Sequence, residues 1–141
     1  MLKKISPLLG PETLATLRIM GHGDKIAIVD GNYPAENHAK RLIRADGLAL
    51  IPILEGILDI LPIEQKTEAI FRAVNADSPT TPDPIHLQMI EACAKYEHRV
   101  VPLAPDLFYS QVQEAFAVIA TSEPELYGNI ILTKGIIHPT K

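Results

Sequence analysis

The residues best suited to chemistry lie between Met20 and Asp30, where a histidine flanked by two glycines precedes a short apolar segment and an aspartate. An imidazole exchanges protons near neutral pH, and a carboxylate accepts hydrogen bonds from hydroxyl groups. Gly21 and Gly23 remove side-chain bulk on both sides of His22, so a ligand or another backbone segment can come close to the ring. The alternative is that Gly21 caps a helix, Gly23 forms a turn and His22 is an exposed loop residue. The spacing alone favours this alternative, so the choice depends on the rest of the chain.

The apolar segment 26–29 has the composition of a buried parallel strand. Asp30 therefore falls at the carboxyl end of a strand, where open α/β sheets bind their ligands. The polar loop 31–38 follows directly and is suited to contact a substrate. Other polar residues at expected loop or strand ends are Asn32, Arg44, Asp46, Tyr127, Asn129 and Lys134. Each also has a simpler explanation as a turn residue, a surface ion pair, a half-buried tyrosine or a solvated lysine.

Helical and strand-like segments alternate along the chain and predict a single α/β domain over residues 1–141, with a mostly parallel sheet between helices. Expected helices cover 11–20, 48–61 and 84–96, and a further helix is capped by Asp106. Expected strands lie in 25–30, 41–47, 67–74, 99–103, 117–121 and 130–133. The helix over 48–61 is apolar on nearly all sides, which predicts a buried or subunit-facing position and favours self-association.

Three histidines and the lone cysteine have simpler interpretations. Cys93 shares a helical spacing with Ile85 and Met89, which predicts a packed core position. His38, His86 and His98 lie in polar surroundings and are expected at the surface.

Bulk properties exclude several classes of function. A chain of 141 residues with 47% hydrophobic and 21% charged residues can bury a core, and its formal net charge of −4 argues against a nucleic-acid partner. No apolar run is long enough to cross a membrane, and the first residues lack the apolar region of a signal peptide. A single cysteine fits a reducing cytoplasm. The chain has no phosphate-binding loop, no closely spaced histidine pair and no Gly-x-Ser-x-Gly motif, so neither a nucleotide site, nor a metal-binding motif, nor serine hydrolysis is expected. A metal site assembled from residues distant in the sequence is the less favoured alternative.

With these residues identified, the chain resembles the RbsD/FucU family of sugar mutarotases, and most closely its L-fucose branch. The likeness extends over nearly the whole chain, and the ordered set of motifs is specific although single pieces are weak. The matching segments are Leu2-Lys3, Ile5-Ser6-Pro7-Leu8, Met20-Gly21-His22-Gly23-Asp24, Asp30, Pro34-Ala35, Arg44-Ala45-Asp46-Gly47, Phe108-Tyr109, Ala115-Phe116-Ala117, Tyr127-Gly128-Asn129-Ile130-Ile131-Leu132 and Lys134-Gly135.

The resemblance implies a three-layer α/β sandwich with a central, mostly parallel sheet flanked by helices. It also implies ring-shaped homo-oligomers, commonly decamers, with sites near subunit contacts. The implied activity is interconversion of the α and β anomers of a free monosaccharide without a cofactor. His22 matches the acid/base histidine of the family, and Asp30 matches its substrate-binding aspartate. The segment Tyr127, Gly128 and Asn129 matches the part that contacts the sugar, and Asn32 stands where some relatives have histidine.

These residue types suit the implied reaction. Anomer exchange requires a proton on the ring oxygen while the anomeric hydroxyl loses one, and a histidine such as His22 can serve both steps. Asp30 can accept hydrogen bonds from sugar hydroxyls and hold the ring against His22, which predicts that both side chains face a common cavity.

One position departs from the family pattern. The resemblance implies an Arg or His that usually precedes the Phe-Tyr pair and touches the sugar, whereas this chain has Pro105 followed by Asp106. The cationic contact is lost or supplied by another residue. This departure favours, as an alternative, a non-catalytic sugar-binding or transport-associated module. A third hypothesis is an acid/base isomerase of an unrelated polar metabolite.

Overall fold

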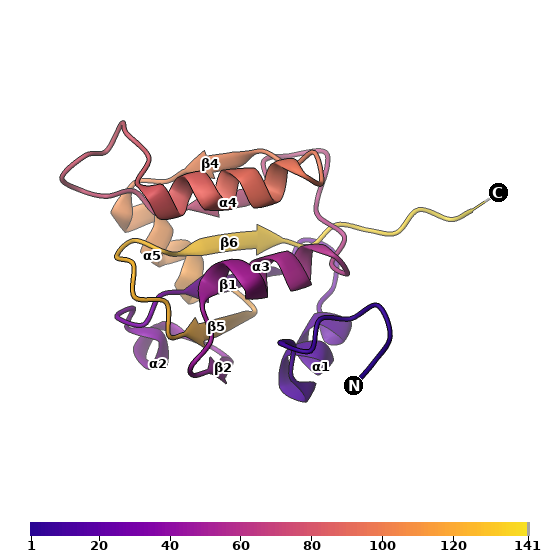
Figure 1. Cartoon of the computed structure of the whole chain (residues 1–141). Helices are drawn as coiled ribbons and strands as arrows, with labels where there is room; N and C mark the ends of the chain where they lie inside the picture. The colour runs from indigo at the N-terminus through magenta and orange to yellow at the C-terminus, as the bar shows by residue number, and fades with distance from the viewer. Residues whose placement is uncertain (141) are drawn as a thin grey trace.

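A six-stranded sheet forms the centre of the computed structural model, which describes residues 1–140 (Figure 1). The strand order is β2-β5-β1-β6-β3-β4. β6 runs antiparallel to both of its neighbours, β1 and β3, and the other strand pairs are parallel, which confirms the expected mostly parallel sheet. The strands are β1 (Lys25–Val29), β2 (Leu42–Ala45), β3 (Ile70–Arg72), β4 (Val100–Pro102), β5 (Ala117–Thr121) and β6 (Ile130–Thr133).

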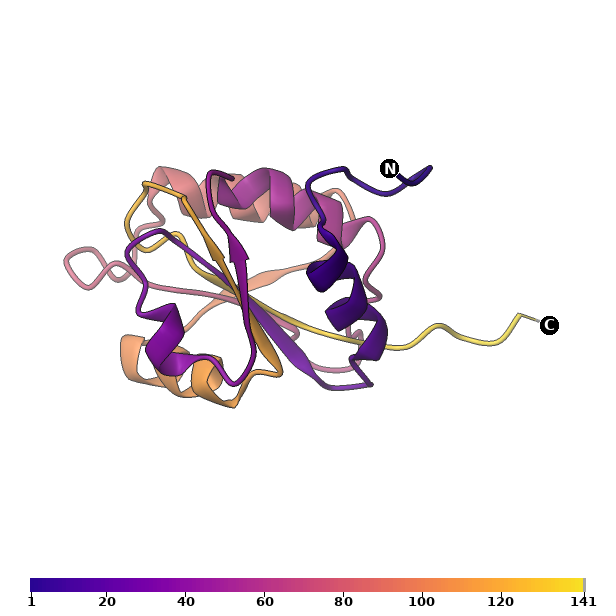
Figure 2. The same ribbon diagram turned by 90° about the horizontal axis from the view of Figure 1, so that it is seen from below.

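Helices cover both faces of this sheet, so the molecule has three layers (Figure 2). The helices are α1 (Pro11–Ile19), α2 (Ala35–His38), α3 (Leu50–Leu58), α4 (Pro84–Ala94) and α5 (Pro105–Glu114). One core contains buried residues of α1, α3 and α4, and the other contains buried residues of α2 and α5. Successive residues of β1 point to opposite faces, so Ile26 and Ile28 enter the first core and Ala27 and Val29 the second. This two-sided burial is the reason for the continuous apolar composition of β1.

Helix α3 is covered within its own chain. Leu50, Ile53, Leu54 and Ile57 are all at most 2% exposed, and the helix packs against α4 and β1. Its apolar character therefore needs no second copy of the chain, which confirms the buried position among the two that were expected. Self-association stays a prediction, and this helix does not support it. Cys93 is fully buried in the same core, as expected.

Two helix ends differ from the expected ones. α5 begins at Pro105 with Ala104 as its N-cap, so Asp106 is a first-turn residue and not a cap. An acidic residue there still interacts favourably with the positive end of the helix dipole. α1 is capped by Met20 and not by Gly21. The short α2 lies within the segment expected to be a loop, because a single helical turn leaves no apolar periodicity to detect.

His86 was expected at the surface, and this expectation is wrong, because its side chain is fully buried. Nδ1 accepts a hydrogen bond from the backbone N–H of Asp83 at 3.0 Å, and Nε2 donates to the carbonyl oxygen of Tyr127 at 2.9 Å. Burial lowers the pKa of His86, and the Tyr127 carbonyl opposes this effect. His38 and His98 are half-buried and not exposed. Within residues 1–140, no helix combines the length and apolar character needed to cross a lipid bilayer.

Gly135, just after β6, lets the backbone of residues 63–64 pack directly against its own backbone. A Cβ atom at this position would lie 2.6 Å from the carbonyl oxygen of Ile63 and 2.8 Å from the backbone nitrogen of Glu64. Both are backbone atoms, which cannot move aside as a flexible side chain can.

We expect Gly135→Ala to lower the free energy of unfolding by about 1–3 kcal/mol, the usual range for overpacking. Urea denaturation would measure this loss. Gly21→Ala is the matched control, since its added Cβ would meet nothing closer than 3.6 Å. Equal unfolding midpoints for the two variants would contradict the close approach at Gly135.

Candidate active site

A buried polar pair lies at the carboxyl end of β1. Because β6 is antiparallel to β1, the residue before β6 lies beside the residue after β1. The side-chain oxygen of Asn129 accepts a hydrogen bond from the backbone N–H of Asp30 at 2.8 Å, and Asp30 Oδ1 accepts one from the backbone N–H of Asn32 at 2.9 Å. Asp30 is 5% exposed and Asn129 is 7% exposed. Burial raises the pKa of Asp30, and hydrogen bonds from Asn32, Asn129, Tyr33 and Gly128 oppose the rise.

The turn formed by Tyr127 and Gly128 is fixed by a hydrogen bond from the buried core. Tyr127 has a left-handed backbone with φ of 60°, which is uncommon for a bulky residue. Its carbonyl oxygen accepts the hydrogen bond from buried His86, so the core fixes the turn that leads to Asn129. A Cβ on Gly128 would lie 3.0 Å from the carbonyl oxygen of Glu125, so a larger residue would displace the turn. Of the six residues predicted from the sequence, five therefore lie at this end of the sheet, namely Asp30, Asn32, Tyr127, Gly128 and Asn129.

A surface hollow of about 270 Å³ adjoins Asp30. Tyr33, Arg44 and Thr121 are among its lining residues, and Arg44 is the one positively charged residue that lines it. Arg44 Nη2 lies 2.7 Å from Asp46 Oδ1, and both side chains are exposed, which confirms the alternative of a surface ion pair. The Asp46 carboxylate raises the pKa of Arg44, so this cation stays charged beside the hollow.

The sequence reasoning missed an aromatic cluster at this end. The Tyr33 hydroxyl lies 2.9 Å from His38 Nδ1, and the Tyr109 ring lies 5.7 Å from the Tyr33 ring and 5.4 Å from the His38 ring. Burial, with smaller contributions from Tyr109 and Asp30, raises the pKa of Tyr33, so its hydroxyl stays protonated. The rings of this cluster are tilted or perpendicular to one another, with 79° between Tyr33 and His38 and 78° between His38 and Tyr109. The cluster places aromatic surface next to a carboxylate, which suits a ligand with both hydroxyl and C–H surfaces.

His22 does not join this cluster. It lies in the loop between α1 and β1, and the next residue, Gly23, donates its N–H to the Lys134 carbonyl just after β6. Asp30 follows the other end of β1, and a strand rises about 3.3 Å per residue, so the five residues of β1 separate the two groups. The expectation that His22 and Asp30 face a common cavity is therefore wrong for a single chain. A segment that precedes a strand lies at its amino end, opposite the aspartate that follows it.

His22 instead pairs with Glu64. His22 Nε2 is hydrogen bonded to Glu64 Oε2, and Glu64 Oε1 accepts the backbone N–H groups of Gln65 at 2.8 Å and Lys66 at 3.1 Å. The Lys66 N–H, followed by His22 and the Gln65 N–H, lowers the pKa of Glu64 to about 2. A small hollow of about 100 Å³ adjoins His22, Glu64, Lys66 and His138.

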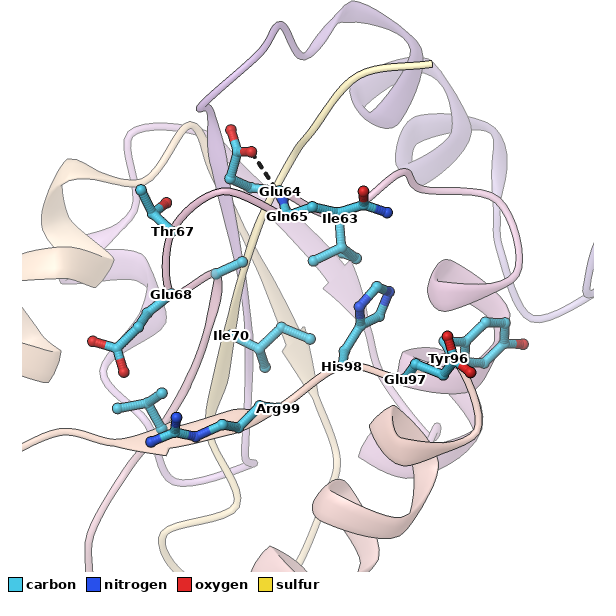
Figure 3. Close-up of a pocket in the computed structure, with 12 residues that line it drawn as sticks. Ile63, Glu64, Gln65, Thr67, Glu68, Ile70, Tyr96, Glu97, His98 and Arg99 are labelled. Carbon is cyan, nitrogen blue, oxygen red and sulfur yellow. Dashed lines mark hydrogen bonds between the residues drawn. The ribbon is translucent and has the colours of Figure 1, made fainter. Parts of the chain in front are cut away.

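Glu64 also lies at the rim of a larger hollow of about 500 Å³ beside β3 and β4 (Figure 3). Its carboxylate bends back toward the backbone of Gln65, as the dashed line shows, and away from His98 and Arg99. Glu64 belongs to no sequence motif, and its pairing with His22 across 42 positions left no signal in the sequence. Among the described residues 1–140, no three His, Cys, Asp or Glu side chains lie close enough together to hold a metal ion.

The fold and these two polar regions define an α/β sandwich protein with ligand-sized hollows at opposite ends of its sheet. Residues 3–137 match the family model described as the RbsD / FucU transport protein family. The chain belongs to the RbsD/FucU family, as the sequence resemblance indicated.

Individual relatives agree with this assignment. The chain is 36% identical over 140 residues to an L-fucose mutarotase of Haemophilus influenzae (strain 86-028NP), covering 96% of this chain and 97% of the relative. It is 38% identical over 147 residues to a fucose mutarotase of Bos taurus, covering 98% and 95%. Among solved structures, the fucose mutarotase of Streptococcus pneumoniae in complex with L-fucose has a TM-score of 0.89 at 32% identity, covering 97% of this chain and 100% of that one.

We expect Asn129→Ala to destabilise the protein by about 1–3 kcal/mol, because the buried N–H of Asp30 loses its acceptor. Thermal or urea unfolding would measure the change. Asn32→Ala is the matched control, since its exposed side chain makes no hydrogen bond within the described residues. A loss for Asn129→Ala no larger than for the control would mean that this bond does not hold the site.

Proposed function

We propose that the protein is a mutarotase that interconverts the α and β anomers of free L-fucose or a closely related monosaccharide. Support comes from the nearly full-length likeness to fucose mutarotases, one of them solved with L-fucose. The observation that carries the proposal is the buried carboxylate of Asp30 beside an open hollow, in a residue whose backbone N–H is bonded to the Asn129 side chain. A hydroxylated ring supplies the hydrogen-bond donors that such a carboxylate accepts.

The residues around Asp30 have complementary roles toward a sugar. Asp30 accepts hydrogen bonds from ring hydroxyls, and Asn129 and Asn32 add amide groups that donate and accept. The ring of Tyr33 covers a C–H face of the sugar, and the Tyr127 hydroxyl is a further donor or acceptor at this end of the sheet. Arg44 is the cation that this hollow offers in place of the one missing at Pro105.

His22 is the proposed acid/base group, and it must come from a second copy of the chain, because β1 separates it from Asp30. Exposed apolar side chains lie at both ends of the sheet and support such a contact. Ile136 borders the hollow beside His22, whereas Tyr109, 44% exposed, packs on Tyr33 beside Asp30. A contact between the His22 end of one chain and the Asp30 end of the next is a head-to-tail contact. Such contacts close into a ring when the rotation between successive chains adds up to a full turn. A homo-oligomeric ring, with the decamer as the family's usual size, is therefore part of the proposal.

The proton transfers balance without a cofactor or metal. His22 accepts the proton of the anomeric hydroxyl and delivers a proton to the ring oxygen as the bond between the anomeric carbon and the ring oxygen breaks, so the imidazole carries no net proton at the end of the step. The product is the open-chain aldehyde, with the carbonyl formed at the anomeric carbon. Rotation of that carbonyl followed by the reverse transfers closes the other anomer. We place this activity in the cytoplasm, which suits the free and buried Cys93.

We expect the wild-type protein to accelerate α/β exchange of L-fucose in NMR exchange spectroscopy, and His22→Ala to lower kcat by about 10²–10⁴-fold, the usual contribution of a general acid/base. His138→Ala is the matched control, because His138 lines the same small hollow without contacting Glu64 through a hydrogen bond. A wild-type protein that leaves L-fucose, D-ribose and D-galactose at the buffer rate would overturn the proposal. Saturable binding without faster exchange would instead support the non-catalytic sugar-binding module.

Mixed assemblies test the shared site. Neither His22→Ala nor Asp30→Asn should be active alone, but equal co-expression of both should restore about a quarter of the wild-type activity. In such a mixture, the chain that supplies His22 to a site has it intact about half the time, and so does the chain that supplies Asp30, so about a quarter of the sites have both. Separately purified and unmixed variants are the control. No recovery in assemblies shown by mass to contain both chains would mean that His22 and Asp30 do not act at one site.

A further inference from the structure

We propose that His86 is a positioning residue for the sugar site: from within the core, it holds the turn at Tyr127 in the conformation that keeps Asn129 beside Asp30. The part of this inference that concerns the sugar rests on the proposed function. The positioning itself depends only on hydrogen bonds within the chain. It predicts that His86 affects how tightly a sugar binds and leaves the proton transfers unchanged.

The His86 ring connects the start of α4 with the turn before β6, which lie at the same end of the sheet (Figure 1). His86 is the third residue of α4, and its Nδ1 accepts the N–H of the N-cap residue Asp83 at 3.0 Å. Glu or Gln commonly makes this contact from the same position, as one half of a capping box. The imidazole has a second nitrogen, and Nε2 donates to the Tyr127 carbonyl at 2.9 Å. Because the side chain is fully buried, His86 acts on a ligand only through this turn.

The Tyr127 carbonyl passes this constraint on to the site. The same oxygen accepts the backbone N–H of Asn129 at 2.9 Å, and the Asn129 side chain accepts the backbone N–H of Asp30 at 2.8 Å. Tyr127 has a φ of 60°, a strained conformation for a bulky residue that persists only where the surroundings hold it. An unbroken series of hydrogen bonds therefore leads from Asp83 through His86 and Tyr127 to Asn129 and Asp30.

The partners of His86 also fix its protonation. A backbone N–H can only donate and a carbonyl can only accept, so Nδ1 must keep its lone pair and Nε2 must carry the proton. Burial lowers the pKa of His86, the Tyr127 carbonyl and Asp83 oppose this effect, and the Arg72 cation adds to it. The neutral ring with a proton on Nε2 is thus the form that joins both partners.

Two amide side chains separate the two bonds of His86. The amide nitrogen of Gln stands as far along the side chain as Nε2 of His, so His86→Gln can donate to Tyr127 while its oxygen caps α4. The amide oxygen of Asn stands where Nδ1 does, so His86→Asn keeps the cap and loses the bond to Tyr127. His98→Asn is the matched control, because it makes the same change at a half-buried histidine whose ring stacks on Tyr96 and makes no hydrogen bond within residues 1–140.

Hydrogen exchange of the Asp30 amide is the first readout, since this N–H shows whether Asn129 stays in place. We expect exchange about 10-fold faster in His86→Asn, as for the loss of one hydrogen bond, and within about 3-fold of the wild type in His86→Gln and His98→Asn. In the L-fucose exchange assay, His86→Asn should raise KM about 10-fold with little change in kcat, because it weakens binding and leaves His22 untouched. His86→Gln should restore KM to within about 3-fold of the wild type.

A folded His86→Asn variant with unchanged Asp30 exchange, or with lower stability but an unchanged KM, would overturn the inference, since His86 would then only stabilise the fold. Faster Asp30 exchange in a protein whose wild type does not accelerate anomer exchange would leave the positioning role intact and reject the proposed function. The wild-type ring gives a test that needs no variant. The ¹⁵N chemical shifts of His86 should show a protonated Nε2 and an unprotonated Nδ1, and the opposite tautomer would also overturn the inference.

Discussion

The antiparallel placement of β6 between β1 and β3 is the constraint on which both polar regions depend. At its beginning, β6 brings Asn129 beside Asp30, where the backbone N–H of Asp30 donates a buried hydrogen bond to the Asn129 side chain. At its end, the carbonyl groups of Thr133 and Lys134 bind the Glu64 segment and the His22 loop. In an all-parallel sheet, a strand in this place would run the other way, and the turn that ends at Asn129 would lie at the opposite edge.

In the proposed reaction, this arrangement gives each chain two different half-sites. The Asp30 end has a buried carboxylate, amides and aromatic rings that suit recognition, whereas the His22 end has an exposed imidazole that suits proton transfer. Neither half-site can reach the other across β1. A reaction that needs both functions therefore links activity to assembly. The reason is that the two loops leave the sheet at opposite ends. The apolar side chains of α3 are not the reason, because they are buried within their own chain.

Local sequence patterns were sufficient for every helix and strand except the short α2, and for part of the site. The β-branched composition of β1 predicted a buried strand and placed Asp30 at its carboxyl end, and proline at the first helical position marked α4. The family motif grouped Tyr127, Gly128 and Asn129 correctly with Asp30. The missed features depend on pairings between distant segments, such as His86 with the Tyr127 carbonyl and Glu64 with His22. A polar residue looks the same in the sequence whether it faces water or a buried partner, so no sequence pattern predicts these pairings.

The two carboxylates show how the same chemical group acquires two roles. Glu64 accepts two backbone N–H groups and the imidazole, its pKa falls to about 2, and its lone pairs are used within the chain, so it is suited to orient a neighbour. Asp30 is buried, and desolvation outweighs its hydrogen bonds and raises its pKa. A buried carboxylate that its own chain stabilises incompletely gains most from added donors. Sugar hydroxyls are such donors, so the physical cost of burying Asp30 favours the sugar binding that we propose for this end of the sheet.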